Sequence, residues 1–212
     1  MPPFRQVPLI PLLTLFLILG ASVWVFVTLV KRETRHRRSL ALLQWARSRN
    51  LRVGGDINLP DLALLKQFKP KIRSIFRGQN LTLVQIETAE TALDAAVIEP
   101  RQWNLLLHNL SATWPTTALR PTAHTISAVD MFSLSSYPSL MPTQRFMIFG
   151  TESQAARSLA ESSASALLPA DIGLILYANH LILDFSDRPF DEIEFDRLID
   201  LSEQLAPKLL RE

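Results

Sequence analysis

The residues best suited to chemistry are His124, Asp130 and Ser133, which lie close together in a stretch rich in Pro, Ser and Thr. A hydroxyl nucleophile needs a base within about 3 Å and hydrogen-bond donors for the oxyanion. Closeness in the sequence establishes neither condition. We therefore interpret the stretch as a structural loop, and we keep a hydrolase that uses these three residues as an alternative.

Other catalytic chemistry finds little support. No two histidines have the i, i+3 or i+4 spacing of a zinc site, and the chain has no cysteine. Its six glycines form neither a phosphate-binding loop nor a dinucleotide fingerprint. Asp184, Asp187 and Asp191 could attract a divalent cation, but a turn and a helix cap account for them better. We expect no cofactor and no metal ion, and we favour a protein that is not an enzyme.

Charge is divided unevenly along the chain, although the formal net charge is only +2. Residues 1–77 carry fourteen Lys or Arg and three Asp or Glu, whereas residues 78–212 carry eight and seventeen. Basic residues alternate with Phe68 and Phe76, as on some nucleic-acid-binding surfaces, but both aromatic residues fit a protein core at least as well. Because the acidic remainder would repel a polyanion, we do not expect nucleic acid as a partner.

The elements that must position these residues follow one organising stretch, residues 9–30, which contains twenty-two residues and no charge. A helix of that length spans about 33 Å, enough to cross a hydrocarbon core of about 30 Å. We therefore predict a transmembrane helix. A signal peptide cleaved near Ala21 is the alternative, but the apolar run continues for nine residues past Ala21 and the basic cluster follows the run instead of preceding it.

Five basic residues follow the apolar run within eight positions: Lys31, Arg32, Arg35, Arg37 and Arg38. Only Arg5 and the amino terminus lie on the other side, so the positive-inside rule places this basic flank in the cytoplasm. We predict a single-pass protein of the inner cell membrane, with its N-terminus outside and its C-terminal domain in the cytoplasm. The flank also suits attraction to anionic lipid headgroups.

After an anchor region of residues 1–38, residues 39–212 are enough for a single soluble domain with its own core. The amphipathic pattern around Trp45 predicts a first helix that ends at Asn50. A short helix is expected at residues 62–68, between two prolines.

A change to alternating apolar residues then predicts a β-hairpin over residues 72–87. The apolar residues 103–108 predict a strand that pairs with residues 81–87. The prolines after Ser111 indicate irregular structure, in which residues 129–134 form a brief edge strand.

The last third of the chain predicts a strand at residues 145–150 and a helix at residues 152–168. Two β-type runs around Asn179 predict a hairpin over residues 172–186. Asp191, followed three residues later by Glu194, predicts the start of a final helix. The fold class that we predict is α+β, with antiparallel strands and helices packed on one side.

This order of elements resembles a loose class of uncharacterised bacterial membrane-anchored proteins with an α+β cytoplasmic domain. The likeness begins at the helix of Trp45 and runs to Leu205, and it includes Gly150-Thr151-Glu152 at the start of a helix. The resemblance implies a single-pass cytoplasmic protein and carries over no catalytic residue.

The function that we expect is a membrane-anchored accessory or interaction module, in contact with the lipid bilayer and with a protein partner. One alternative is the membrane-tethered hydrolase described above. The other is a sensor of anionic lipid that uses the basic region from Lys31 to Arg52.

Overall fold

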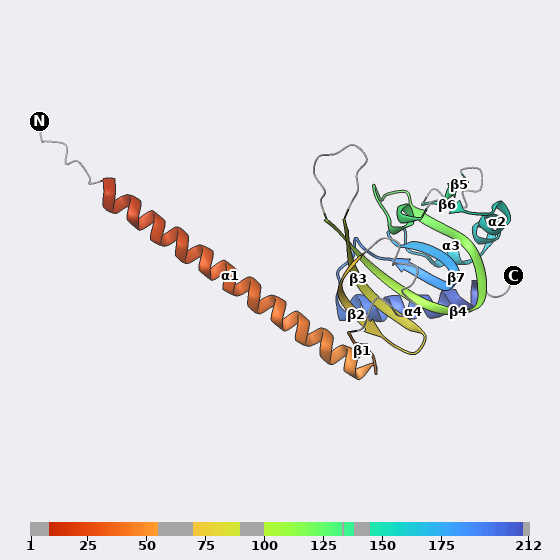
Figure 1. Cartoon of the computed structure of the whole chain (residues 1–212), viewed down its shortest axis with the longest axis horizontal. Helices are drawn as coiled ribbons and strands as arrows, with labels where there is room; N and C mark the ends of the chain where they lie inside the picture. Colours follow the sequence, from red (N-terminus) through yellow and green to blue (C-terminus); the bar gives the residue numbers. More distant parts are fainter. Residues whose placement is uncertain (1–8, 55–69, 90–99, 133, 138–144, 210–212) are drawn as a thin grey trace, which may run out of the picture. The chain divides into compact units, whose positions relative to one another are not determined.

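A computed structural model describes residues 9–54, 70–89, 100–132, 134–137 and 145–209 (Figure 1). The chain divides into two compact units, Met1–Gln44 and Trp45–Glu212. The second unit has an antiparallel sheet together with helices, so the predicted α+β class is confirmed. The boundary predicted after Arg38 falls inside the first helix.

Helix α1 (Leu9–Ser48) runs without a break for 40 residues. The chain leaves it at Asn50, whose φ of 54° is in the left-handed region that asparagine tolerates, so the predicted end of this helix is confirmed. Large apolar side chains between Leu19 and Val30 are exposed. Within the described part of the chain, no helix is both long enough and apolar enough for a membrane crossing.

The predicted hairpin is confirmed by strands β2 (Lys71–Arg77) and β3 (Leu81–Ala89), which pair antiparallel. The short strand β1 (Arg52–Val53) extends the sheet beyond β2. Strand β4 (Pro100–Pro121) pairs with β3 over its first part, which confirms the predicted partner of residues 103–108.

The prediction of irregular structure from Ser111 onward is wrong for residues 111–121, because β4 continues to Pro121 as a strand of 22 residues. Its far end pairs with β6 (Phe146–Gly150), and β5 (Ser135–Ser136) lies beyond β6. On its other edge, β4 pairs with β7 (Gly173–Asp184). Proline is tolerated at position 115 because no described strand is in register with it on either edge, and the β4–β7 register shifts between Trp114 and Thr117.

The predicted hairpin at residues 172–186 is also wrong, because β7 is one strand whose two halves both pair with β4. Ala178 has a φ of 51°, and the β4 register shifts between Asn109 and Trp114, so both strands bend at the same place. The bend brings the ends of β7 together. A Cβ added to Gly173 would lie 3.2 Å from the Cβ of Asp184.

Three smaller predicted elements either differ in the structure or lie outside the residues that it describes. The edge strand predicted at residues 129–134 is wrong for the residues described there, which include most of the 3-10 helix η2 (Ala128–Met131) and no strand. The single helix predicted at residues 152–168 is two helices, α2 (Ser153–Glu161) and α3 (Ala164–Leu167). The predicted helix at residues 62–68 lies outside the described residues.

Helix α4 (Glu192–Leu209) starts as predicted, since the carboxylate of Asp191 accepts a hydrogen bond of 3.0 Å from the backbone N–H of Glu194. It packs on one face of the sheet, where Phe195 lies 6.0 Å from the ring of Phe76. Neighbouring strands place Leu83 and Leu106 in register with Phe76 on this face. These contacts make the first half of the core.

The opposite face of the sheet packs against η2. Ile75, Val84 and Leu105 are successive partners across β2, β3 and β4, and they share a buried cluster with Val129 of η2. Because side chains alternate along a strand, Asp184, which pairs with Leu105, falls on this face. A buried carboxylate is thereby placed at the edge of an apolar core.

Candidate functional site

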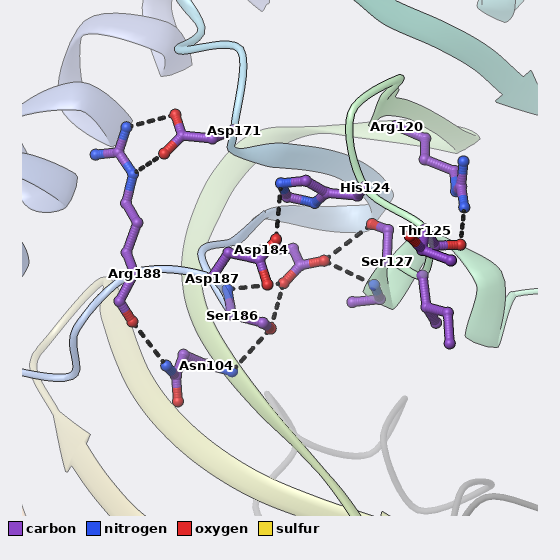
Figure 2. Close-up of polar contacts among 12 residues, drawn as sticks. Asn104, Arg120, His124, Thr125, Ser127, Asp171, Asp184, Ser186, Asp187 and Arg188 are labelled. Atoms are coloured by element: carbon purple, nitrogen blue, oxygen red, sulfur yellow. Dashed lines mark hydrogen bonds and ion pairs between the residues drawn. The ribbon is translucent and has the colours of Figure 1, made fainter.

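A polar cluster surrounds Asp184, a residue that is only 1% exposed (Figure 2). One carboxylate oxygen accepts hydrogen bonds from Ser127 Oγ at 2.9 Å and from the backbone N–H of Ala128 at 2.7 Å. The other accepts from the backbone N–H of Ser186 at 3.2 Å and from its Oγ at 2.5 Å. We call these four residues the Asp184 cluster. It fastens the start of η2 to the end of β7.

The cluster continues into the sheet through Asn104. The backbone N–H of Asn104 donates to Ser186 Oγ at 3.1 Å, and its side-chain amide donates to the carbonyl of Arg188 at 3.3 Å (Figure 2). The Asn104 side-chain oxygen accepts from Gln85 at 3.0 Å. A chain of hydrogen bonds therefore connects β3 and β4 with the segment between β7 and α4.

Arg188 joins two further segments to this one. Its Nε and Nη2 donate to the two carboxylate oxygens of Asp171 at 2.7 and 2.6 Å, and its Nη1 donates to Glu194 at 2.5 Å. The hydrogen bonds from Arg188 lower the pKa of Asp171, and the bond to Asp171 raises the pKa of Arg188. The side chain of Glu194 is only 5% exposed, so this guanidinium pairs with a carboxylate that is largely removed from water.

Replacing Arg188 with methionine is expected to lower the free energy of unfolding by about 3 kcal/mol, because a buried carboxylate loses its closest cation. This free-energy value takes into account that Arg197 remains 3.5 Å from Glu194 and that the side chain of Asp171 is half exposed. Urea unfolding followed by tryptophan fluorescence measures the change. Arg157→Met, on an exposed residue of α2, is the matched control, and an equal loss in both variants would contradict the prediction.

The structure does not bring the three predicted catalytic residues together. The buried ring of His124 contacts Asp187, with its Nε2 3.1 Å from the carboxylate. Asp130 instead pairs with Arg120 at 2.9 Å, and accepts a 2.8 Å hydrogen bond from the backbone of Ser127 in the cap of η2. Ser133 lies outside the described residues. His124 and Asp130 therefore each have a different partner.

The Asp184 cluster is closed to solvent, which decides what it can do. Both Ser127 and Asp184 are 1% exposed, and the Ser127 hydroxyl already donates to the carboxylate. A substrate has no route to this hydroxyl without opening the contact between η2 and β7. The arrangement acts as a structural fastening of the sheet.

A second buried polar contact joins β4 to α4. The Nδ1 of His108 lies 2.9 Å from Ser202 Oγ, which also lies 2.9 Å from the carbonyl oxygen of Ile199. Burial lowers the pKa of His108, against an opposing contribution from Glu203. Burial therefore favours the neutral form of this imidazole.

Stability is expected to decrease as the pH falls below about 6.5, because the unfolded chain takes up a proton at His108 more readily than the folded one. The contribution is fully present above that pH and is lost as the pH falls through the lower folded-state pKa. Urea midpoints of the wild type and His108→Gln, measured between pH 7.5 and 5, test this. The variant should show the flatter profile, and identical profiles would contradict the assignment.

An open pocket of about 330 Å³ lies where β4 bends. Its walls come from the bent part of β4, from the first half of α2 and from the end of α4: Ala112, Thr113, Trp114, Pro115, Glu152, Gln154, Ala155, Ser158 and Leu209. Trp114 is partly buried, whereas Glu152 and Gln154 are exposed. No residue predicted from the sequence as a site residue lines this pocket.

The basic flank is exposed where the structure describes it. Lys31, Arg32 and Arg38 are open to solvent, and Arg37 forms a surface ion pair with Glu33 at 2.9 Å. The side chain of Arg35 lies outside the described part. An exposed pair of this kind adds little to stability.

Comparison with known proteins gives one likeness of fold. No family model and no curated protein sequence matches the chain. Among solved structures, the chain is similar to the mycobacterial trehalose monomycolate transport factor A, TtfA, with a TM-score of 0.52 and 13% sequence identity. The match covers 79% of this chain and 91% of that one. At this identity the likeness shows a shared fold and nothing more.

Sequence reasoning missed Ser127 and Ser186 as partners of Asp184. One signal was present, since Ser127 and Asp130 have the spacing of a capping box, which the structure forms at η2. Recognising it would have placed a helical turn there and removed Asp130 from the catalytic candidates. Nothing in the sequence pairs Ser127 with a residue 57 positions away.

Proposed function

We propose that the protein is a membrane-anchored, single-pass interaction module whose folded domain lies in the cytoplasm and serves a protein partner. The observation that carries the proposal is the continuity of α1, which joins the uncharged residues 9–30 and the basic flank to Trp45 in one helix of 40 residues. An uncharged run ahead of a basic collar is the pattern of a cytoplasm-facing anchor.

The polar residues support an interaction role over catalysis. The Asp184 cluster is closed to solvent, and the hydrogen bonds of Asn104 and Arg188 connect parts of the fold. His124 contacts Asp187, whereas Asp130 forms an ion pair with Arg120, which gives the hydrolase alternative no favourable geometry. A partner protein would therefore bind to the accessible surface of the domain and not to these buried polar residues.

The fold likeness to a transport factor suggests where to look for that partner. We propose that the module assists a transport complex in the same membrane. A protein held beside the bilayer reaches a membrane-embedded partner at a high effective concentration, so a weak domain surface is enough for recognition.

Alkaline carbonate washing of membranes tests the anchor. The full-length chain should stay in the membrane pellet, and a variant that lacks residues 9–30 should be released. A fluorescent reporter at the C-terminus should be active in the cytoplasm, whereas alkaline phosphatase at the same position should be inactive. Release of the full-length chain, or the opposite reporter pattern, would overturn the proposal.

Cross-linking in intact cells, followed by purification in mild detergent, tests the partner. We expect a membrane protein to be recovered with the wild type and to be lost when residues 45–212 are deleted. Recovery of no protein above the level of the anchor-only control would count decisively against an interaction module.

A further inference from the structure

One stretch of the sheet has an open edge between two paired ends. On the same edge of β4, the pairing with β3 ends at His108, and the pairing with β6 begins at Thr117. One backbone hydrogen bond extends each pairing by one residue of β4. The N–H of Asn109 donates to the carbonyl of Asn80, and the N–H of Thr151 donates to the carbonyl of Thr116. Residues 110–115, which we call the β4 gap, face no described strand on this edge.

The pocket coincides with the β4 gap. Four residues of the gap, 112–115, line the pocket together with residues of α2 and the end of α4. The bend of β4 accounts for this, because the register with β7 shifts between Asn109 and Trp114, where β4 carries more residues than β7. The pocket is therefore a cleft with an open strand edge along one side.

The chemistry of the walls has an apolar part and an acidic part. Trp114, Ala155 and Leu209 supply apolar surface, and Glu152 is the one charged residue among the described residues that line the pocket. The side chain of Glu152 makes no capping hydrogen bond at the start of α2. It is thus available to a cation that enters the cleft.

We infer that the β4 gap is a binding site for an extended segment of a partner protein, with one apolar side chain in the pocket and a flanking Lys or Arg beside Glu152. An extended peptide presents N–H and C=O groups at the spacing of an open strand edge, which other ligand classes do not match. At about 3.3 Å per residue, the gap takes a segment of about four to six residues. This inference rests on the proposed interaction function and assigns its surface.

The test uses the full-length protein, purified in mild detergent and immobilised, as the target for a phage-displayed library of random twelve-residue peptides. Selected peptides should alternate apolar and other residues and carry Lys or Arg. A synthetic consensus peptide should bind with 1:1 stoichiometry, more weakly at high salt, and should slow amide hydrogen exchange at residues 111–114.

Matched variants locate the site. Trp114→Ala should weaken peptide binding at least tenfold, and Glu152→Lys should weaken it several-fold. Glu161→Lys makes the same charge change at an exposed position of the same helix, outside the pocket, and should leave binding unchanged. Far-ultraviolet circular dichroism checks that each variant is folded.

Three outcomes would overturn the inference: no peptide is enriched, the peptides bind the two pocket variants as tightly as the wild type, or the chain self-associates through Trp114 and excludes peptide. The last result would assign the cleft to a second copy. Membrane retention and the cross-linked partner are measured in the same Trp114→Ala strain. If both persist while peptide selection fails, the site is wrong and the proposed function stands.

Discussion

Replacing Asp184 with alanine is expected to lower the free energy of unfolding by about 3–5 kcal/mol, the largest effect of any single polar substitution that we propose. The physical reason is that four donors, from Ser127, Ala128 and Ser186, lose one buried acceptor at once. Urea unfolding of the full-length chain in detergent, followed by tryptophan fluorescence, gives the change.

Two companion variants make the Asp184 result specific. Asp184→Asn keeps one acceptor oxygen but turns an amide towards one set of donors, so about half of the loss is expected. Asp200→Ala removes an exposed carboxylate from α4 and should change stability by less than about 0.5 kcal/mol. If Asp184→Ala and Asp200→Ala are equally stable, the cluster does not hold η2 to β7.

Replacing Trp45 with alanine is expected to cost about 3–5 kcal/mol, because a large aromatic side chain leaves the core. Trp45 is 9% exposed and packs against Phe195, with ring centroids 5.1 Å apart, and against Phe76 at 6.1 Å. Its indole N–H donates to Asp196 at 2.9 Å, and Arg49 forms an ion pair with the same carboxylate oxygen at 2.8 Å.

The packing and hydrogen-bonding parts of the Trp45 contact are separable. Trp45→Phe keeps most of the apolar surface and should lose only about 1 kcal/mol. Trp45→Ala should also speed amide exchange in the last turn of α1, at residues 45–48, whereas His108→Gln should not. Unchanged exchange there would contradict the attachment of this turn through Trp45.

Local patterns predicted the elements that local physics determines. The β2–β3 hairpin follows from alternating apolar residues on both sides of a short polar turn, and the two strands pair antiparallel. Asp191 lies at a helix start because its carboxylate reaches the N–H of Glu194, three residues on. Asn50 ends α1 because it tolerates a positive φ. Each depends on neighbours within a few residues.

The errors arise where distant segments decide the structure. Prolines normally break strands, but Pro115 lies in the β4 gap, where no described strand needs its missing N–H. Asn179 suggested a hairpin turn, and the chain does bend at Ala178, yet both halves of β7 pair with β4 because β4 bends beside them. A sequence pattern can indicate where a strand bends, but it does not indicate which strand pairs with it.

The same limit applies to the polar cluster. The sequence suggested that the acidic residues near Asp184 serve turns and helix caps, and Asp191 does so. Asp184 differs because it lies on the face that η2 covers, which depends on its register with Leu105, almost eighty positions earlier. The pocket was missed for the same reason, since its walls come from three separate elements.

The sharing of β4 among several partners has a consequence for how the chain folds during synthesis. Residues 105–119 are translated more than fifty positions before β7, which must pair with them. Until the ribosome has released β7, that edge of β4 is an unpaired apolar ribbon, and contacts so far apart in sequence form slowly. Nascent chains halted before residue 173 are therefore expected to aggregate more readily than full-length chains. They are also expected to bind chaperones more strongly.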